Sequence, residues 1–274
     1  MHLSDVCGGC IHSAVLYYFI FRNGGSDLYL SSSWFNKVIN ALANWANKIY
    51  KSFYNALIPD RRYLAYIEGL KVTILISFFA IILGIIIGVI VAVLKVVASN
   101  NKMKWLSKLC NIYITVIRGT PLMVQLLIIY NLIFTSRNTN ELVVGSVCFG
   151  INSGAYVAEI IRSGIESIDK GQLEAGRSLG LNYIRTMRLI ILPQAIRNIL
   201  PALGNEFITL IKETSVASVI AITDLTQAAQ YIGSRTWDIL PPLLIAALCY
   251  LIIVMGLSKL LSILERRMAK SDRS

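Results

Sequence analysis

Long runs without a charged residue dominate the chain from about residue 70 onward. Val72–Leu94 is the longest, with 23 uncharged residues, and a helix needs about 20 apolar residues to cross the hydrocarbon core of a bilayer. Further uncharged runs of 20, 18 and 17 residues are Ile239–Ser258, Gly119–Ser136 and Leu142–Ala158. These four runs predict four membrane-spanning helices.

A fifth span is predicted within Asn198–Thr223, although Glu206, Lys212 and Glu213 interrupt its apolar character. We therefore expect an all-α, polytopic membrane protein with about five transmembrane helices. No internal repeat is visible in the sequence. Because five unduplicated helices are few to enclose a solute path, we expect the path to form between two subunits of a dimer.

An amphipathic helix is predicted ahead of these runs, from Trp34 to Leu57. Its apolar positions recur at helical spacing and are Phe35, Val38, Ile39, Leu42, Trp45, Ile49, Phe53 and Leu57. Two interpretations stay open, namely a helix lying on the outer membrane surface or one packing against neighbouring spans. Pro59 follows directly and ends the helix.

The location of the basic residues gives the orientation of the chain in the membrane. The formal net charge is +11, and most Lys and Arg residues follow the first, third and last spans. Positive loops face the cytoplasm, so we expect the amino terminus outside, the carboxyl terminus in the cytoplasm and an odd number of spans. The charge thus reports topology, and no nucleic-acid partner is expected.

With this orientation, the sequence divides into three regions. Residues 1–62 form an N-terminal extracytoplasmic extension with the amphipathic helix, residues 63–268 the transmembrane domain, and residues 269–274 a cytoplasmic tail. With 55% hydrophobic and only 15% charged residues, the chain is too apolar for a typical soluble domain.

Several kinds of chemistry have no residues to support them. No glycine-rich phosphate loop ending in Gly-Lys-Ser/Thr occurs, so this chain has no such cradle for ATP. Its two histidines, His2 and His12, lie outside the predicted spans, and the spacing of Cys7 and Cys10 fits neither a zinc site nor haem attachment. We therefore expect no catalysis, no metal and no cofactor, with ATP bound by a partner subunit.

The loop between the third and fourth spans contains a short helix with unusual features. Glu174 is placed in its first turn, where a carboxylate is favoured by the helix dipole, and Gly180 ends it. Ala175 and Gly176 leave a face without bulk, from whose side Arg177 projects. Such a helix is suited to sit in a groove of another protein, whereas the alternative is an ordinary loop helix.

The same residues resemble the cytoplasmic signature of permease subunits of ATP-binding-cassette (ABC) importers. Glu174 and Ala175, Gly180 six residues after Glu174, and the later Ile190-x-Leu192-Pro193 ending carry this resemblance. The family pattern has alanine where this chain has Gly176, a change that lowers helix propensity by up to about 1 kcal/mol.

Three further stretches resemble the polar-amino-acid branch of the type I permeases. They are Arg118–Leu126, Ala155–Ile165 and Pro193–Ser215, and the resemblance covers about residues 63–268. It implies a subunit of the bacterial cytoplasmic membrane that pairs with a second copy or a sister permease. It also implies two ABC ATPase subunits bound through the Glu174 helix, an extracytoplasmic solute-binding protein and an amino-acid substrate.

Polar residues at membrane depth are candidates for the solute path, because each is costly in lipid unless it faces a cavity or a partner. Gly119 and Pro121 flank Thr120 and should loosen the helix there. Gln125 lies about one turn deeper. The alternative role of Thr120 and Gln125 is hydrogen bonding between helices.

The fourth predicted span contributes the second set of path candidates. Glu206, Thr209 and Glu213 share one helix face through their i, i+3, i+7 spacing, and Thr214 follows directly. Two carboxylates on one face favour a cationic amino acid slightly. The alternative for Glu206 is an ion pair with Arg197 or Lys212.

Two structural expectations and one competing function complete the picture. Glu159 and Arg162 should form a structural ion pair, and the four-residue spacing of Gly84 and Gly88 should let another helix approach closely. The competing function is a secondary carrier driven by an ion gradient, which would use Glu206 and Glu213 as its titrating pair.

Overall fold

The computed structural model describes residues 28–100, 103–134 and 139–271. The chain divides into two compact units, Met1–Tyr54 and Asn55–Ser274, each described by itself. Helices and their connections account for all the described residues, which contain no strand. The predicted all-α class is confirmed.

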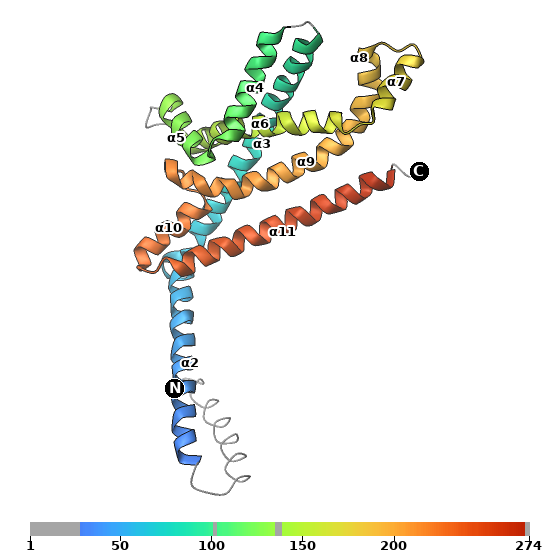
Figure 1. Cartoon of the computed structure of the whole chain (residues 1–274). Coiled ribbons are helices and arrows are strands. Elements are labelled where there is room, and N and C mark those ends of the chain that lie inside the picture. The colour runs from blue at the N-terminus through green and yellow to red at the C-terminus, as the bar shows by residue number, and fades with distance from the viewer. Residues whose placement is uncertain (1–27, 101–102, 135–138, 272–274) are drawn as a thin grey trace. The chain divides into compact units, whose positions relative to one another are not determined.

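Helix α2 forms the described part of the first unit and extends to the start of the second (Figure 1). It begins at Leu28 and ends at Leu57, so the helix predicted from Trp34 is confirmed and starts six residues earlier. A short 3-10 helix, η1, follows α2 at Pro59–Arg61. Asp60 and Arg61 have positive φ angles, so α2 does not continue directly into the next helix.

The membrane domain in the second unit consists of nine α-helices, one π-helical segment and one further 3-10 helix in the described residues. Their bounds are α3 Tyr63–Asn100, α4 Lys104–Gly119, α5 Leu122–Ile133, α6 Glu141–Glu166, α7 Lys170–Ser178, α8 Tyr183–Thr186, η2 (the π-helical segment) Met187–Ile191, α9 Leu192–Glu213, η3 Thr214–Ile220, α10 Leu225–Thr236 and α11 Leu240–Ser271.

Three of the described helices are long and apolar enough to cross a membrane, namely α3, α6 and α11. They contain the predicted spans Val72–Leu94, Leu142–Ala158 and most of Ile239–Ser258. The bent pair α4 and α5 would make a fourth span if it crosses as one unit.

The prediction that Gly119–Ser136 forms a span by itself is wrong. α4 ends at Gly119, and α5 begins at Leu122 after a bend of 116°. The 12 residues of α5 rise only about 18 Å at 1.5 Å per residue, less than the thickness of the hydrocarbon core. The cause is Pro121, which fixes an extended turn between the two helices.

The fifth predicted span corresponds to α9, but its predicted bounds are wrong. The α-helix ends at Glu213 and gives way to η3, and the positive φ of Ala221 ends that segment. α9 carries Arg197, Glu206, Lys212 and Glu213, so it is not among the helices that pass by length and apolar composition.

Helices α3 and α6 pack closely enough that their contact depends on glycine. A Cβ on Gly84 would lie 2.9 Å from Ser153 Oγ. One on Gly88 would lie 2.5 Å from Val157 Cγ1 and 2.9 Å from the backbone nitrogen of Ala158. The expected close approach at Gly84 and Gly88 is confirmed, and the partner helix is α6.

The reciprocal contact comes from glycines of α6. A Cβ on Gly150 would lie 2.7 Å from Leu83 Cδ2, and one on Gly154 would lie 2.7 Å from Ile87 Cγ2. Around this contact, buried Ile76 of α3, Phe149 of α6 and Leu126 of α5 belong to the main hydrophobic core. Small residues therefore bring the two backbones together, while large neighbours fill the space beside them.

A second set of contacts fastens α10 and α11 to α3. The buried Asp224 carboxylate caps α10 by accepting from the backbone N–H groups of Thr226 (3.0 Å) and Gln227 (2.9 Å). It also accepts from the Tyr250 hydroxyl of α11 at 3.2 Å. The neighbouring backbone N–H of Leu225 donates to Thr73 Oγ1 of α3.

Replacement of Gly88 by alanine should destabilise the membrane domain by about 1–3 kcal/mol, because the β-branched Val157 and the backbone at Ala158 leave no room for a methyl group. The measurement is thermal unfolding of the purified chain in mild detergent. Gly256→Ala on α11 is the matched control, since no atom lies within 4 Å of its added Cβ. Equal melting temperatures for the two variants would contradict the packing argument.

Candidate functional site

Helix α7 begins earlier than the sequence suggested. Asp169 is its N-cap, with Oδ1 accepting from the backbone N–H of Gly171 at 2.6 Å. Glu174 is therefore the fifth residue of α7, and its predicted place in the first turn is wrong. The available sequence signal was Asp169 followed three residues later by Gln172, the spacing of a capping box.

The end of α7 is the glycine-closed turn that was predicted. Gly180 adopts a left-handed φ of 81°. Its N–H donates to the carbonyl of Arg177 at 3.0 Å, and the N–H of Leu181 donates to the carbonyl of Gly176 at 3.1 Å. These two bonds form a Schellman motif, in which glycine is favoured for its conformation.

Gly176 faces into the protein. It is buried, and an added Cβ would collide with the Thr186 side chain and approach Ile190 Cδ1 at 3.2 Å. The expectation that Ala175 and Gly176 share one outward face is therefore wrong. Glycine lets α7 pack directly on α8 and η2, which explains why alanine is absent at this position.

The exposed side of α7 carries the remaining predicted coupling residues. Glu174, Ala175 and Arg177 are all exposed. Leu179, which the sequence interpretation did not include, is 80% exposed beside them. We call these four residues the α7 surface.

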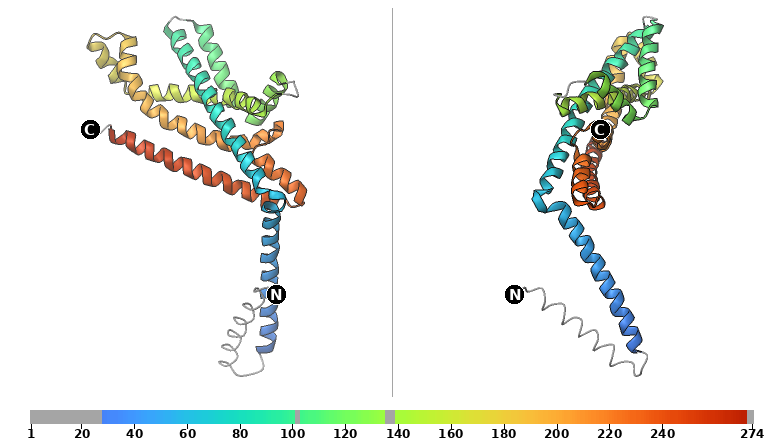
Figure 2. Two further views of the ribbon diagram at one scale, coloured as in Figure 1. Left: turned by 180° about the vertical axis from the view of Figure 1, so that it is seen from behind. Right: turned by 90° about the vertical axis from the view of Figure 1, so that its left-hand side faces the viewer.

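The α7 surface is connected to α9 through a compact junction. α7 packs on η2, and η2 continues into α9. Asn182 caps α8 by accepting from the N–H of Arg185 at 2.9 Å, and Asn198 of α9 donates to Ser167 Oγ, just after α6, at 2.8 Å. Figure 2 shows α7 and α8 beyond the start of α9, at the end away from α10.

Gln125 fastens the bend between α4 and α5. It is only 6% exposed, and its Nε2 donates to the carbonyls of Ile117 (2.6 Å) and Thr120 (2.9 Å). Its Oε1 accepts from Asn152 of α6 at 2.7 Å. These contacts match the alternative of interhelical hydrogen bonding.

Thr120 differs from Gln125 in its exposure. Its side chain is exposed at the bend and its hydroxyl donates to the carbonyl of Val116 at 2.8 Å. The hydroxyl oxygen lies 2.7 Å from Gln125 Nε2 and accepts from it. Thr120 is thus part of the same network and remains open on one side.

The path candidates of α9 have different surroundings. Glu206 Oε1 accepts from Ser153 Oγ of α6 at 2.8 Å, a partner that the sequence did not suggest. Thr209 and Glu213 are partly buried. Thr214 is fully buried and donates to the carbonyl of Ile211 at 2.8 Å, so it does not face an open path in this conformation.

Arg118 and Tyr156 lie within the stretches that carry the family resemblance, where no role was assigned to either, and the structure brings them together. The Arg118 guanidinium carbon lies 5.5 Å from the centroid of the Tyr156 ring. Glu206 and Glu213 lie within electrostatic reach of the same tyrosine. Tyr156 of α6 thus has a cation from α4 over its ring and experiences the charge of two carboxylates from α9. We call these four residues the charged cluster.

The predicted ion pair of Glu159 and Arg162 is confirmed. Arg162 Nη2 lies 2.5 Å from Glu159 Oε1, and Arg162 also pairs with Glu166. Arg118 Nη1 lies 3.6 Å from the same Glu159 oxygen. A structural network thus connects the end of α4 with α6.

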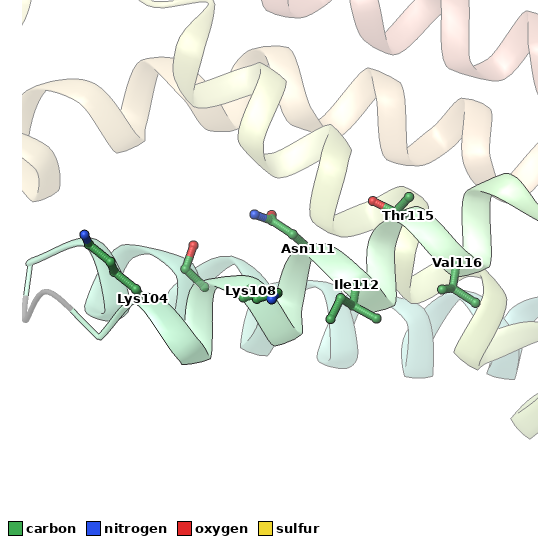
Figure 3. A pocket seen from close by; sticks show the side chains of 7 residues that line it. Lys104, Lys108, Asn111, Ile112, Thr115 and Val116 are labelled. Carbon is green, nitrogen blue, oxygen red and sulfur yellow. The ribbon is translucent and has the colours of Figure 1, made fainter.

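A shallow hollow lies along α4, with a volume of about 400 Å³. It is lined by Lys104, Ser107, Lys108, Asn111, Ile112, Thr115 and Val116, most of them polar (Figure 3). It contains none of the predicted path residues. Among the described residues, no group of His, Cys, Asp and Glu could hold a metal ion.

These features define a class of protein. It is a helical membrane domain with charged groups between its helices, and its exposed, capped helix α7 packs on α8 and η2. This arrangement is that of a permease subunit. Residues 80–270 match the family described as the inner membrane component of binding-protein-dependent transport systems. The match covers more than half of the chain, and the chain belongs to this family.

Individual relatives extend the comparison. The chain is 44% identical to the putative glutamine transport system permease protein GlnP of Rickettsia typhi, over 74% of this chain and 92% of that protein. It is 37% identical to the arginine transport system permease protein ArtQ of Bacillus subtilis, over 80% of this chain and 98% of that protein. A crystal structure of an amino acid ABC transporter with histidines matches with a TM-score of 0.70 and 46% identity, over 75% and 94% of the two chains.

These comparisons decide between the two functions left open by the sequence. The chain is a permease subunit of an ABC importer, in the type I architecture that was predicted, and not an ion-gradient-driven carrier. Residues 1–79 lie outside the family match.

Replacement of Gly176 by valine should loosen the seat of α7, because its side chain has to displace Thr186 and Ile190. Amide hydrogen exchange in residues 170–181 should rise by roughly 5- to 150-fold, which corresponds to about 1–3 kcal/mol of local stability. Ala175→Val is the matched control, because Ala175 is exposed. Similar exchange in both variants would show that Gly176 does not hold α7.

Proposed function

We propose that the chain carries a polar amino acid across the bacterial cytoplasmic membrane as one member of a permease pair. The charged cluster is the observation that carries this proposal. A free amino acid bears a carboxylate and an ammonium group. Arg118 offers donors for the carboxylate, and Glu206 and Glu213 offer negative charge for the ammonium group.

The state of each charged group supports this role. Arg118 is 40% exposed, and its ion pair with Glu159 is long, at 3.6 Å, which leaves guanidinium donors available. Glu213 is partly buried, and no hydrogen bond to its carboxylate occurs within the described residues. With two carboxylates against one arginine, the cluster favours a cationic amino acid. The names of the relatives, which include glutamine and arginine permeases, agree with a polar amino acid as the solute.

The energy for transport comes from other chains in this proposal. This sequence has no phosphate loop for ATP, so ABC ATPase subunits bind the nucleotide and this chain needs no cofactor and performs no catalysis. Those subunits bind the α7 surface on the cytoplasmic side. The second permease is another copy or a sister chain, and an extracytoplasmic binding protein delivers the solute.

Coupling follows from how α7 is attached. Gly176 seats α7 on α8 and η2, and η2 continues into α9, which carries Glu206 and Glu213. A displacement of α7 by the ATPase therefore moves two members of the charged cluster relative to α6, where Tyr156 remains. This is the rigid coupling that alternating access needs. The distribution of basic residues supports an orientation with α7 and the carboxyl terminus in the cytoplasm and the amino terminus outside.

Reversing the charge of Glu174 should uncouple the ATPase. In the reconstituted complex, Glu174→Lys should lower solute-stimulated ATP hydrolysis at least about tenfold, as expected when a buried interface charge is reversed. Glu68→Lys on α3 is the control, because Glu68 is also exposed but lies far from α7 in the sequence. Wild-type stimulation in the Glu174 variant would refute the coupling role.

Neutralising Glu213 should change solute preference. In proteoliposomes, Glu213→Gln should slow arginine uptake by roughly tenfold and glutamine uptake much less, because only arginine needs the second negative charge. Lys212→Gln provides the neighbouring control, since Lys212 is exposed on the same helix. An equal loss of both uptakes, or of neither, would show that Glu213 does not select by charge.

A further inference from the structure

Helix α2 lies entirely outside the part of the chain that matches the permease family. It has 30 residues and no acidic residue. From Phe35 to Leu57, its large apolar side chains are Phe35, Val38, Ile39, Leu42, Trp45, Ile49, Tyr50, Phe53, Tyr54 and Leu57. Its polar side chains are Asn36, Lys37, Asn40, Asn44, Asn47, Lys48, Lys51 and Asn55, apart from serines.

The two kinds of side chain occupy opposite sides of α2. At about 100° per residue, Leu42, Ile49 and Phe53 fall along one line of the helix. Asn44 and Lys51 fall along the opposite line. From Phe35 to Leu57 the three lysines stay on the side opposite Leu42, Ile49 and Phe53, and Tyr54 lies at the boundary between the two sides.

Much of the apolar side of α2 is exposed in the structure, although Val38, Ile49 and Phe53 are half-buried. Trp45 is 64% and Tyr50 68% exposed, and Leu42 is exposed beside them. Exposed aromatic area of this extent disfavours water as the surrounding medium. An apolar cover is therefore required.

The polar side excludes a membrane-spanning position. Lys37, Lys48 and Lys51 are distributed along the helix, and a crossing helix would bury at least one ammonium group in hydrocarbon at high cost. α2 is not among the described helices that are apolar enough to span.

The charge of α2 selects the partner. Its polar side presents only positive charge, which complements the anionic headgroups of a lipid surface. Trp45 and Tyr50 suit the boundary between headgroups and acyl chains, because each ring has an apolar body and a polar edge. We propose that α2 is a lipid-binding helix that lies in the headgroup region of an anionic bilayer, with its apolar side toward the acyl chains.

A label scan of the full-length chain tests this proposal. Single cysteines are introduced from residue 38 to residue 53 in a background without the native cysteines, and each carries a nitroxide. The protein is reconstituted in vesicles of phosphatidylethanolamine and phosphatidylglycerol. The ratio of accessibility to oxygen over a water-soluble nickel chelate should oscillate every 3.6 residues. Maxima at Leu42, Ile49 and Phe53 should exceed minima at Asn44 and Lys51 by roughly threefold or more.

Each alternative arrangement gives a different profile. A spanning helix gives one broad maximum without oscillation. A helix packed on protein, including the binding protein or another permease, gives an apolar side closed to both reagents. A helix free in water gives high nickel accessibility at every position. Any of these three results overturns the proposal.

The preference for anionic lipid has its own test. Charge reversal at all three lysines (Lys37→Glu, Lys48→Glu and Lys51→Glu) should reduce the amplitude of the oscillation at least twofold in phosphatidylglycerol vesicles. The matched variant Lys37→Arg, Lys48→Arg and Lys51→Arg should keep the wild-type amplitude. In vesicles of phosphatidylcholine alone, the charge-reversed and arginine variants should be equal. An unchanged amplitude in the charge-reversed protein with phosphatidylglycerol overturns the anionic preference.

Discussion

The close contact between α3 and α6 is the constraint on which the membrane domain depends. In lipid, apolar side chains gain little by leaving their surroundings, so helices associate through contact and hydrogen bonding. Gly84 and Gly88 on one helix and Gly150 and Gly154 on the other remove the side chains that would separate the backbones. The closely packed pair then provides a surface on which the bent helices α4 and α5 and the charged helix α9 pack.

Helix α6 uses this fixed position to hold polar partners. Asn152 bonds to Gln125 at the bend of α4 and α5, and the next residue, Ser153, bonds to Glu206 of α9. Tyr156, about one turn further, lies beneath Arg118. Neighbouring residues of one rigid helix thus position the bend, the acidic helix and the charged cluster. Because buried polar groups are expensive unless bonded, these contacts also fix the register of the helices around α6.

The sequence predicted the long spans, the capping glycine of α7 and the permease family, because each depends on a local pattern. Sequence-based predictions were wrong where the structure depends on which residues of other helices lie nearby. The sequence indicated a loosened helix at Gly119 and Pro121 but not a bend of 116°, and Gly176 faces inward because it packs against Thr186. The Ser153 partner of Glu206 is 53 residues away, and no spacing rule connects the two. Arg118 was visible as part of a motif, but only the fold brings it over Tyr156.

Asp224 anchors the chain a short distance after α9, the helix that carries Glu206 and Glu213. The Asp224 carboxylate accepts hydrogen bonds from α10 and α11, and the backbone of the next residue, Leu225, donates to α3. The opposite end of α9 continues from η2, on which α7 packs. A helix of 22 residues is about 33 Å long at 1.5 Å per residue. Tilting it by roughly 10° about the Asp224 end would move its start by about 6 Å and Glu206 by only about 2 Å. Under the proposed function, a large displacement at the α7 end of α9 would therefore reach Glu206 as a movement about one third as large.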